Sequence, residues 1–121
     1  MNFHFPKEER LKSQKAIKAL FLNGKTLVKY PVKVYYIPQS ELKTSKATFA
    51  VPKKNFKHAV TRNRIKRQMR EAYRLHKHML TVNNGSNFAL VFLYINKEMP
   101  QYEQLQSSIC SLLKKLDHEA S

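Results

Sequence analysis

Hydrophobic side chains recur with a helical period in three parts of this chain of 121 residues. The first part lies near the N-terminus, where Ser13 is a suitable helix cap and Asn23-Gly24 is expected to end the helix in a left-handed turn. Between them, apolar side chains recur every three or four residues, at Ile17, Leu20 and Phe21. The pattern predicts a short amphipathic helix from about Gln14 to Leu22.

Two further segments show the same period. A long segment from about Ala59 to Leu80 has one apolar side, formed by Ile65, Met69, Ala72, His76 and Met79. The C-terminal segment also has one, formed by Tyr102, Leu105, Ile109, Leu112, Leu113 and Leu116. Both are predicted to be helices that pack these sides on a core.

Strand patterns lie between the helices. Tyr30 to Ile37 alternates and is rich in Val and Tyr, and Lys46 to Val51 ends before Pro52. We expect these two segments to form a hairpin through the polar loop Gln39 to Ser45. The continuous apolar run from Phe88 to Ile95 is typical of a strand covered on both faces.

The predicted elements follow the order α-β-β-(β)-α-β-α, in which the bracketed strand is optional. This order predicts an α+β fold, a two-layer sandwich of helices on a sheet. No repeat, low-complexity tract or linker divides the sequence. We therefore expect one domain over residues 1–121, with short flexible ends at about 1–9 and 117–121.

The charge points to the kind of partner. The chain has 23 Lys and Arg against 8 Asp and Glu, a formal net charge of +15. Between Thr61 and Arg74, six of fourteen residues are basic and only Glu71 is acidic. Because a surface of one sign repels itself, it favours a polyanion such as nucleic acid. On a helix, the polar residues of this region gather opposite the apolar side: Asn63, Lys66, Arg67, Arg70, Arg74 and Lys77.

Other compartments and partners are disfavoured. The longest apolar run, Phe88 to Ile95, has eight residues, which is too short to cross a membrane, and no N-terminal signal segment is recognised. Cys110 is the single cysteine, which excludes an intramolecular disulfide and suits a reducing cytosol. We expect a cytoplasmic protein with no membrane partner.

The sequence predicts no chemistry by the chain itself. Its eight acidic residues are scattered, whereas a two-metal nuclease needs clustered carboxylates. The two glycines, Gly24 and Gly85, cannot form a glycine-rich phosphate loop. His76 falls on the apolar side of its helix, where a structural role is expected. We predict no catalytic residue, no metal ligand and no cofactor bound by the protein alone.

Aromatic residues give a second candidate surface. Phe21 lies on the first predicted helix, and the first predicted strand carries Tyr30, Tyr35 and Tyr36. Aromatic side chains on an open sheet can stack unpaired bases, although most aromatic residues in strands and helices belong to the core. Both interpretations remain open for Phe21 and Tyr35.

Two other kinds of nucleic-acid-binding protein would need a similar charge. A ribosomal or other structural RNA-binding protein would bind one folded RNA and have no use for a single-strand cleft. A DNA-binding module could place Asn63 and Arg64 on base edges in a major groove. The helix pair of a helix-turn-helix and the heptads of a zipper are both missing, so we predict no DNA partner.

Three motifs together resemble the protein subunit of bacterial ribonuclease P. They are Phe49-Ala50-Val51-Pro52-Lys53-Lys54, Ala59-Val60-Thr61-Arg62-Asn63-Arg64-Ile65-Lys66-Arg67 and Arg70-Glu71-Ala72-Tyr73-Arg74. An Arg-Asn-Arg that enters a basic helix after a strand ending in Lys-Lys is the signature of that family. Length, charge and element order agree over about residues 10–116.

The resemblance implies a protein cofactor of a catalytic RNA. The ribonucleoprotein would act as an endoribonuclease that hydrolyses one phosphodiester bond and removes the 5′ leader from precursor tRNA. The RNA would carry the chemistry, with Mg²⁺ in the RNA-protein holoenzyme. The resemblance also implies a left-handed β-α-β crossover. The residues expected to contact RNA are Arg62, Asn63, Arg64, Lys66, Arg67 and Arg70, to which the basic surface adds Arg74, Lys53 and Lys54.

The resemblance also implies a cleft between the first helix and the sheet that holds the single-stranded leader. Phe21, Tyr35 and Lys53 match its positions, and Ile17 stands where many members have Phe. Aliphatic packing at Ile17 would replace stacking at that point. Pro52 stands where a small polar residue is common.

Overall fold

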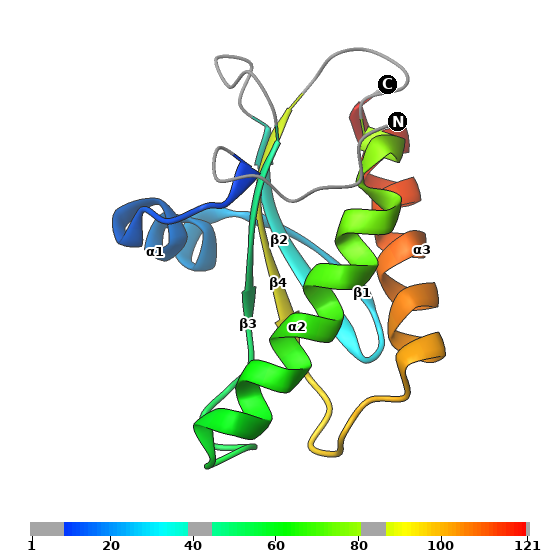
Figure 1. Ribbon diagram of the computed structural model, residues 1–121. Helices are drawn as coiled ribbons and strands as arrows, with labels where there is room; N and C mark the ends of the chain where they lie inside the picture. The colour runs from blue at the N-terminus through cyan, green and yellow to red at the C-terminus, as the bar shows by residue number, and fades with distance from the viewer. Residues whose placement is uncertain (1–8, 39–44, 81–86, 121) are drawn as a thin grey trace.

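A computed structural model of the protein describes residues 9–38, 45–80 and 87–120 (Figure 1). Its helices are α1 (Gln14–Asn23), α2 (Ala59–His76) and α3 (Tyr102–Ala120), and a 3₁₀ turn at Lys77–Leu80 continues α2. Its strands are β1 (Lys25–Lys29), β2 (Val32–Pro38), β3 (Lys46–Ala50) and β4 (Phe88–Tyr94). The α+β class and the three helices predicted from the sequence are confirmed.

The four strands form one mixed sheet in the order β1-β2-β4-β3. β1 pairs with β2 and β2 with β4 in antiparallel fashion, whereas β3 pairs with β4 in parallel. The expected hairpin between β2 and β3 is therefore wrong, because β4 lies between them; residues 39–44 of its loop lie outside the described part. β4 takes the interior position because six of its seven residues are buried.

β1 supplies the optional strand of the predicted order, although the sequence pattern did not locate it. Leu27 is half-buried in it, and the other four residues are exposed. β1 forms the edge of the sheet and pairs only with β2, with Thr26 opposite Tyr35. An edge strand with so little burial leaves almost no hydrophobic pattern in the sequence.

α2 and α3 lie together on one face of the sheet, and α1 lies on the other (Figure 1). The larger core fills the space under α2 and α3, with Val34 from β2, Phe92 from β4 and Tyr73 from α2. A smaller core lies under α1 and includes Leu11, Leu20 and Val91. α2 and α3 thus form the predicted helical layer on one face of the sheet. α1 covers part of the other face.

α1 begins at its predicted cap, but its end differs from the prediction, because Gly24 is extended and not left-handed. The Ser13 Oγ accepts a hydrogen bond from the Ala16 N–H at 3.2 Å, and the Gly24 N–H donates to the Leu20 carbonyl oxygen at 2.9 Å. A Cβ atom at Gly24 would lie 2.5 Å from that oxygen, so glycine is required by the close approach of the chain. The helix extends one residue beyond the predicted end, to Asn23.

α2 joins the two parallel neighbours β3 and β4, and the β3-α2-β4 connection has the left-handed sense that the family resemblance implies (Figure 1). Most connections of this type are right-handed. The consequence is that α2 lies over the β3 edge of the sheet, beside α3. Its buried residues face the core, so its polar side faces outward.

The segment before α1 runs along the free edge of β3. Arg10 forms a parallel bridge with Ala47, and the Leu11 N–H donates to the Ala47 carbonyl oxygen at 2.9 Å. The Glu9 carboxylate also forms an ion pair with the Lys77 ammonium, at 2.7 Å. Residues 9–12 therefore link β3 to the C-terminal end of α2.

Candidate RNA interface

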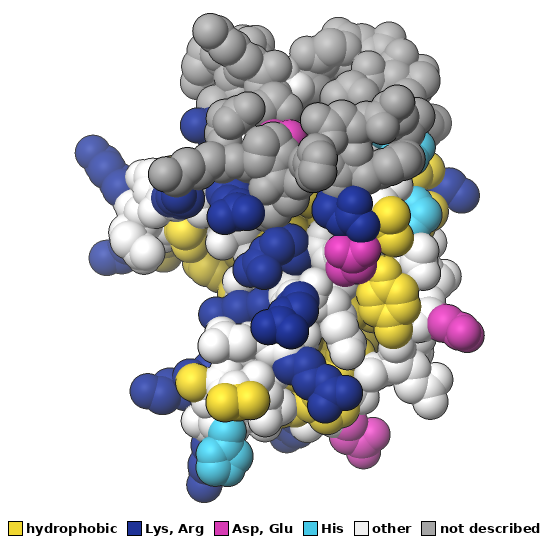
Figure 2. Space-filling model, viewed as in Figure 1, with side chains coloured by type: hydrophobic (Ala, Val, Ile, Leu, Met, Phe, Trp, Pro, Cys, Tyr) yellow, Lys and Arg dark blue, Asp and Glu magenta, His cyan; other side chains and the backbone are white. Residues whose placement is uncertain are grey.

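The two sides of α2 have the roles predicted from the sequence. Ile65, Met69 and Ala72 are buried in the core, together with Tyr73, and His76 and Met79 are half-buried. The opposite side is polar and basic. Lys and Arg side chains gather along α2 and over the neighbouring edge of the sheet, whereas Asp and Glu are sparse on this face (Figure 2).

The basic surface is most open in the first two thirds of α2. Asn63, Arg64, Arg67 and Arg70 are exposed at intervals that keep them near one another, and Lys66 is half-buried beside them. Lys53 and Lys54 are exposed in the turn that precedes the helix. These residues form a continuous surface for the phosphates of a nucleic-acid backbone.

Arg62 differs from its neighbours because its guanidinium is used inside the protein. Its Nη1 donates to the Phe56 carbonyl oxygen at 2.8 Å and to the Lys57 carbonyl oxygen at 2.9 Å. These bonds fasten the turn before α2 to the first turn of the helix. Arg62 therefore supports the local fold, in addition to any contact with RNA.

The cations at the C-terminal end of α2 have acidic partners. Arg74 forms a two-pronged hydrogen bond with Glu71, Nε to Oε2 at 3.1 Å and Nη2 to Oε1 at 2.5 Å. That hydrogen bond lowers the pKa of the Glu71 carboxyl and raises the pKa of Arg74. Lys77 is paired with Glu9, as described above. The positive potential is consequently concentrated toward the start and middle of the helix.

A cavity of about 350 Å³ opens between residues 10–12, the edge of β3 and the middle of α2. Four cationic side chains line it, with Ala47, Thr48 and Phe49 from β3 as its floor. The Arg70 guanidinium carbon lies 6.0 Å from the centre of the Phe49 ring, within reach of a cation–π contact. The four cations are Arg10, Lys12, Lys66 and Arg70.

The second candidate surface lies on the other face of the sheet, under α1. Phe21 and Tyr35 meet edge to face, with ring centroids 4.8 Å apart and an angle of 64° between the rings. Phe21 keeps 42% of its surface exposed, whereas Tyr35 and Ile17 are half-buried. The Lys33 Nζ lies 4.9 Å from the centre of the Tyr35 ring. We call Ile17, Phe21, Lys33 and Tyr35 the aromatic surface.

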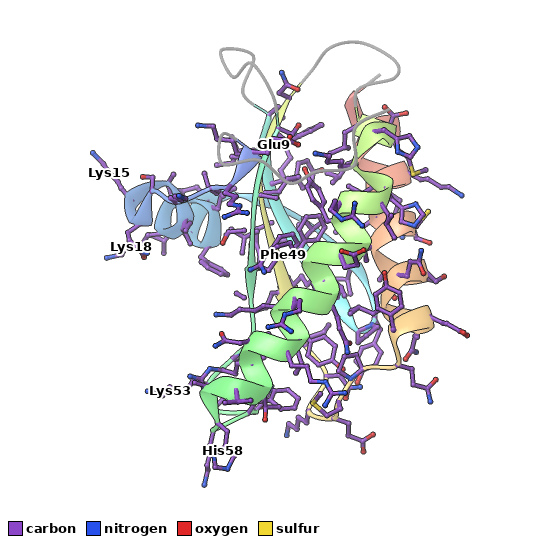
Figure 3. The ribbon with its side chains drawn as sticks, viewed as in Figure 1. Glu9, Lys15, Lys18, Phe49, Lys53 and His58 are labelled. Atoms are coloured by element: carbon purple, nitrogen blue, oxygen red, sulfur yellow. The ribbon has the colours of Figure 1, made fainter. Side chains whose placement is uncertain are left out.

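The structure separates the tyrosines of this region. Tyr36 points to the opposite face and is buried, with its ring 5.9 Å from that of Phe88. Tyr30 is exposed in the turn between β1 and β2. Lys53 lies on the same side of the sheet as α1, near the start of α2 (Figure 3). Of the predicted cleft residues, Ile17, Phe21 and Tyr35 come together, and Lys53 lies farther along the same side.

The described residues do not offer a metal site. No group of three or more His, Cys, Asp or Glu side chains in residues 9–38, 45–80 and 87–120 lies close enough together to hold a metal ion. Two acidic residues next to cations of α2, Glu9 and Glu71, are engaged with Lys77 and Arg74. None of the helices in the described part is long and apolar enough to span a membrane.

Three residues of these surfaces were not predicted from the sequence. Lys33 is one of them, and its signal was the alternation in β2, which puts it on the same face as Tyr35. Arg10 and Lys12 precede the first helix, where the sequence shows no periodicity. Only the pairing of this segment with β3 brings them next to α2.

Comparisons with known proteins point in one direction. The model of the Ribonuclease P family matches residues 5–117. The ribonuclease P protein component of Porphyromonas gingivalis is 36% identical over 112 residues, which cover 88% of this chain and 82% of the relative. That of Chlorobium phaeobacteroides is 36% identical over 125 residues, which cover 91% and 86%.

Solved structures agree with the sequence comparison. The ribonuclease P protein from Thermotoga maritima superposes with a TM-score of 0.73 and 25% identity, and the match covers 88% of this chain and 96% of that one. The Staphylococcus aureus ribonuclease P protein gives a TM-score of 0.69 at 25% identity, with coverage of 88% and 94%. Sequence and fold are thus similar to the same group of proteins.

Proposed function

Since this chain belongs to the family of bacterial ribonuclease P protein components and serves as the protein cofactor of that enzyme, we propose that it binds two RNAs on two surfaces. The basic side of α2 binds the catalytic RNA. The aromatic surface, with Lys53, binds the single-stranded 5′ leader of precursor tRNA. The assembled particle hydrolyses one phosphodiester bond and releases the leader.

The observation that carries the first part is the exposed basic side of α2. Asn63, Arg64 and Arg67 are exposed on a helix whose other side is fixed in the core, so their positions are set by the fold. Arginine can hold a phosphate with two parallel hydrogen bonds, which fixes orientation as well as charge. Such contacts position a protein on RNA without reading its sequence.

The second part rests on the exposed edge-to-face pair of Phe21 and Tyr35. Stacking on an aromatic ring suits an unpaired base of any type, as a leader of variable sequence requires. Lys33 and Lys53 on the same side supply charge for the backbone. Ile17 lies half-buried beside them and offers an aliphatic contact in place of a third ring.

The residues that the structure describes form no cluster of ligands suited to the Mg²⁺ ions of the reaction. Mg²⁺ needs oxygen ligands from one or more carboxylates, and the carboxylates of Glu9 and Glu71 are committed to cations. We propose that the catalytic RNA holds the metal ions. The protein then contributes by offsetting phosphate repulsion where the catalytic RNA and the precursor meet.

A leader-length series tests this division of labour. The complex of protein and ribonuclease P RNA would be titrated with precursor tRNAs whose leaders grow one nucleotide at a time, and with mature tRNA. We expect affinity to rise as the leader reaches the aromatic surface, and to stop rising beyond it. Affinity that is independent of leader length would contradict the leader part and leave RNA binding by α2 intact.

The alternative of a ribosomal or other structural RNA-binding protein is not favoured by the relatives, which are ribonuclease P components. The same titration separates the two, because a protein that binds one folded RNA gains nothing from a leader.

A further inference from the structure

We propose that the cavity between residues 10–12 and α2 is a composite pocket for one backbone phosphate of the catalytic RNA. Arg10 and Lys12 form one wall and Lys66 and Arg70 the other, with Thr48 at the floor. This inference rests on the proposed function and extends it from the helix to the segment that precedes α1.

The first support is the charge of the pocket. Four of its eight lining residues are cationic, and none of these lining residues is acidic. Four cations around one volume favour the binding of an anion between them.

In addition to burial, the crowding acts on the pKa of Arg70. Burial lowers it, and the nearby charges of Arg10 and Arg67 lower it further. Arg70 is therefore repelled by one cation from the segment before α1, Arg10, and by one from its own helix, Arg67. A phosphate between Arg10 and Arg70 would reverse this effect and favour both charges.

The second support is the way in which the walls are held. The bridge from Arg10 to Ala47 and the hydrogen bond from the Leu11 N–H fix the backbone of residues 10 and 11 against β3. The buried Leu11 side chain and the Glu9–Lys77 ion pair hold the same segment from either side. Binding thus requires little ordering of the backbone, which is one of the main costs of recognition.

The third support is the composition of the floor. The Phe49 ring lies between β3 and α2, as Figure 3 shows, and the Arg70 guanidinium lies over it. Thr48 offers a hydroxyl that can donate to a phosphate oxygen or bond to a ribose hydroxyl. A floor that is partly apolar, in a volume of about 350 Å³, fits a phosphate with its attached sugar better than a bare ion.

The fourth support is the position of the pocket. It opens beside the exposed row of Asn63 and Arg67, so that an RNA backbone along α2 can continue into it. This continuity favours the catalytic RNA as the source of the phosphate. The leader would instead lie on the other face of the sheet, with Phe21 and Tyr35.

A double-mutant cycle on the full-length protein tests the pocket. Arg10→Gln, Arg70→Gln and the double variant would be titrated with ribonuclease P RNA over a range of salt concentrations. Lys115→Gln on the exposed part of α3 serves as the control that removes an equal charge elsewhere. Lys12→Gln is a second pocket variant whose exposed side chain is easily replaced.

We expect Arg10→Gln to weaken binding by about tenfold and to reduce the log–log salt slope by roughly 0.7–0.9, the value for one phosphate contact. Lys12→Gln should change the slope in the same direction, and Lys115→Gln should leave it unchanged. The double variant should lose less than the product of the two single losses, since both arginines hold one phosphate.

An unchanged slope for both Arg10→Gln and Lys12→Gln, with wild-type folding by circular dichroism, would overturn the pocket. So would losses that multiply in the double variant, or a loss that is seen with precursor tRNA alone and not with the catalytic RNA. These results leave the proposed function untouched, because wild-type binding and leader release are measured separately.

Discussion

The two groups of cations on α2 look alike in the sequence and differ in the structure. Arg64, Arg67 and Arg70 are exposed on the outer side of the helix. Arg62 is bonded to two backbone carbonyls, and Arg74 is bonded to Glu71. A count of basic residues therefore overstates the charge that the helix offers to RNA. The charge available to RNA depends on which guanidinium groups already form hydrogen bonds within the protein.

The largest expected effect comes from the exposed group. Replacing both Arg64 and Arg67 by Ala should weaken binding to ribonuclease P RNA by roughly 100-fold, if each charge-assisted hydrogen bond contributes about 1.5 kcal/mol. The salt slope should fall by roughly 0.7–0.9 for each phosphate that is no longer neutralised. Filter binding at several salt concentrations measures both, and thermal unfolding should show an unchanged midpoint. An unchanged slope would remove these residues from the interface.

Arg62→Ala should show the opposite profile. It removes hydrogen bonds to the carbonyl groups of Phe56 and Lys57, at 2.8 and 2.9 Å, and should lower the free energy of unfolding by about 1–3 kcal/mol. Chemical denaturation measures this loss, and Arg64→Ala is the matched control. Equal stability of the two variants would show that the bonds of Arg62 contribute nothing to the fold.

The aromatic surface allows a test on the other face of the sheet. Tyr35→Ala should reduce affinity for precursor tRNA by about 1–3 kcal/mol, the value of one stacked base, and leave mature tRNA binding unchanged. Tyr30→Ala replaces an exposed tyrosine in the turn and serves as the control. If Tyr35→Ala lowers the affinity for precursor tRNA and mature tRNA equally, the role of Tyr35 is structural.

A smaller effect is expected when Arg74 is released from its partner. Glu71→Ala removes the carboxylate that accepts both hydrogen bonds from Arg74 and raises its pKa, so the guanidinium loses this partner and can turn toward RNA. Affinity should rise by a few-fold, and the salt slope should steepen by at most the value for one neutralised phosphate, roughly 0.7–0.9. Arg74→Ala should cancel the gain in the double variant. If the double variant still binds RNA more tightly than the wild type, the gain in affinity does not come from Arg74.

The smallest effect concerns the packing of α2 on α3. The His76 ring nitrogen lies 3.1 Å from the Gln106 amide nitrogen. Burial lowers the pKa of His76, and the nearby charges of His78 and Lys114 lower it further. At a pH between the folded pKa and the unfolded pKa, His76 is therefore protonated more fully in the unfolded chain than in the folded protein. Stability should be constant above about pH 6.5, fall as the pH drops through the lower folded pKa, and level off below it. His76→Gln should reduce this pH dependence in unfolding experiments.

The sequence predicted the helices well because each has one apolar side that must be buried. Ile65, Met69 and Ala72 on α2, and Leu105 and Ile109 on α3, are all in the core. β4 was also predicted, since its apolar run could belong only to an interior strand or a buried helix.

Strand pairing could not be predicted in the same way. Local patterns do not state which strands are neighbours, and the adjacent segments β2 and β3 are separated by β4. The optional strand of the predicted order could not be located at β1, because almost all residues of β1 are exposed.

The candidate site could be predicted only in part, because local patterns do not show long-range contacts. Charge and periodicity are local, so the basic side of α2 could be found from them. The partners of Arg62 and Arg74 and the approach of Arg10 to Arg70 depend on side-chain directions and on a long-range contact. Lys33, by contrast, could have been found from the sequence, because the alternation of β2 puts it on the same face as Tyr35.

The most direct test of the account is reconstitution at low magnesium concentration. Release of the 5′ leader from precursor tRNA would be followed with ribonuclease P RNA alone, with the protein alone, and with both. The account predicts rapid release only when both are present, and its loss with the Arg64→Ala, Arg67→Ala variant. Release by the RNA that the wild-type protein does not accelerate, or release by the protein alone, would contradict it.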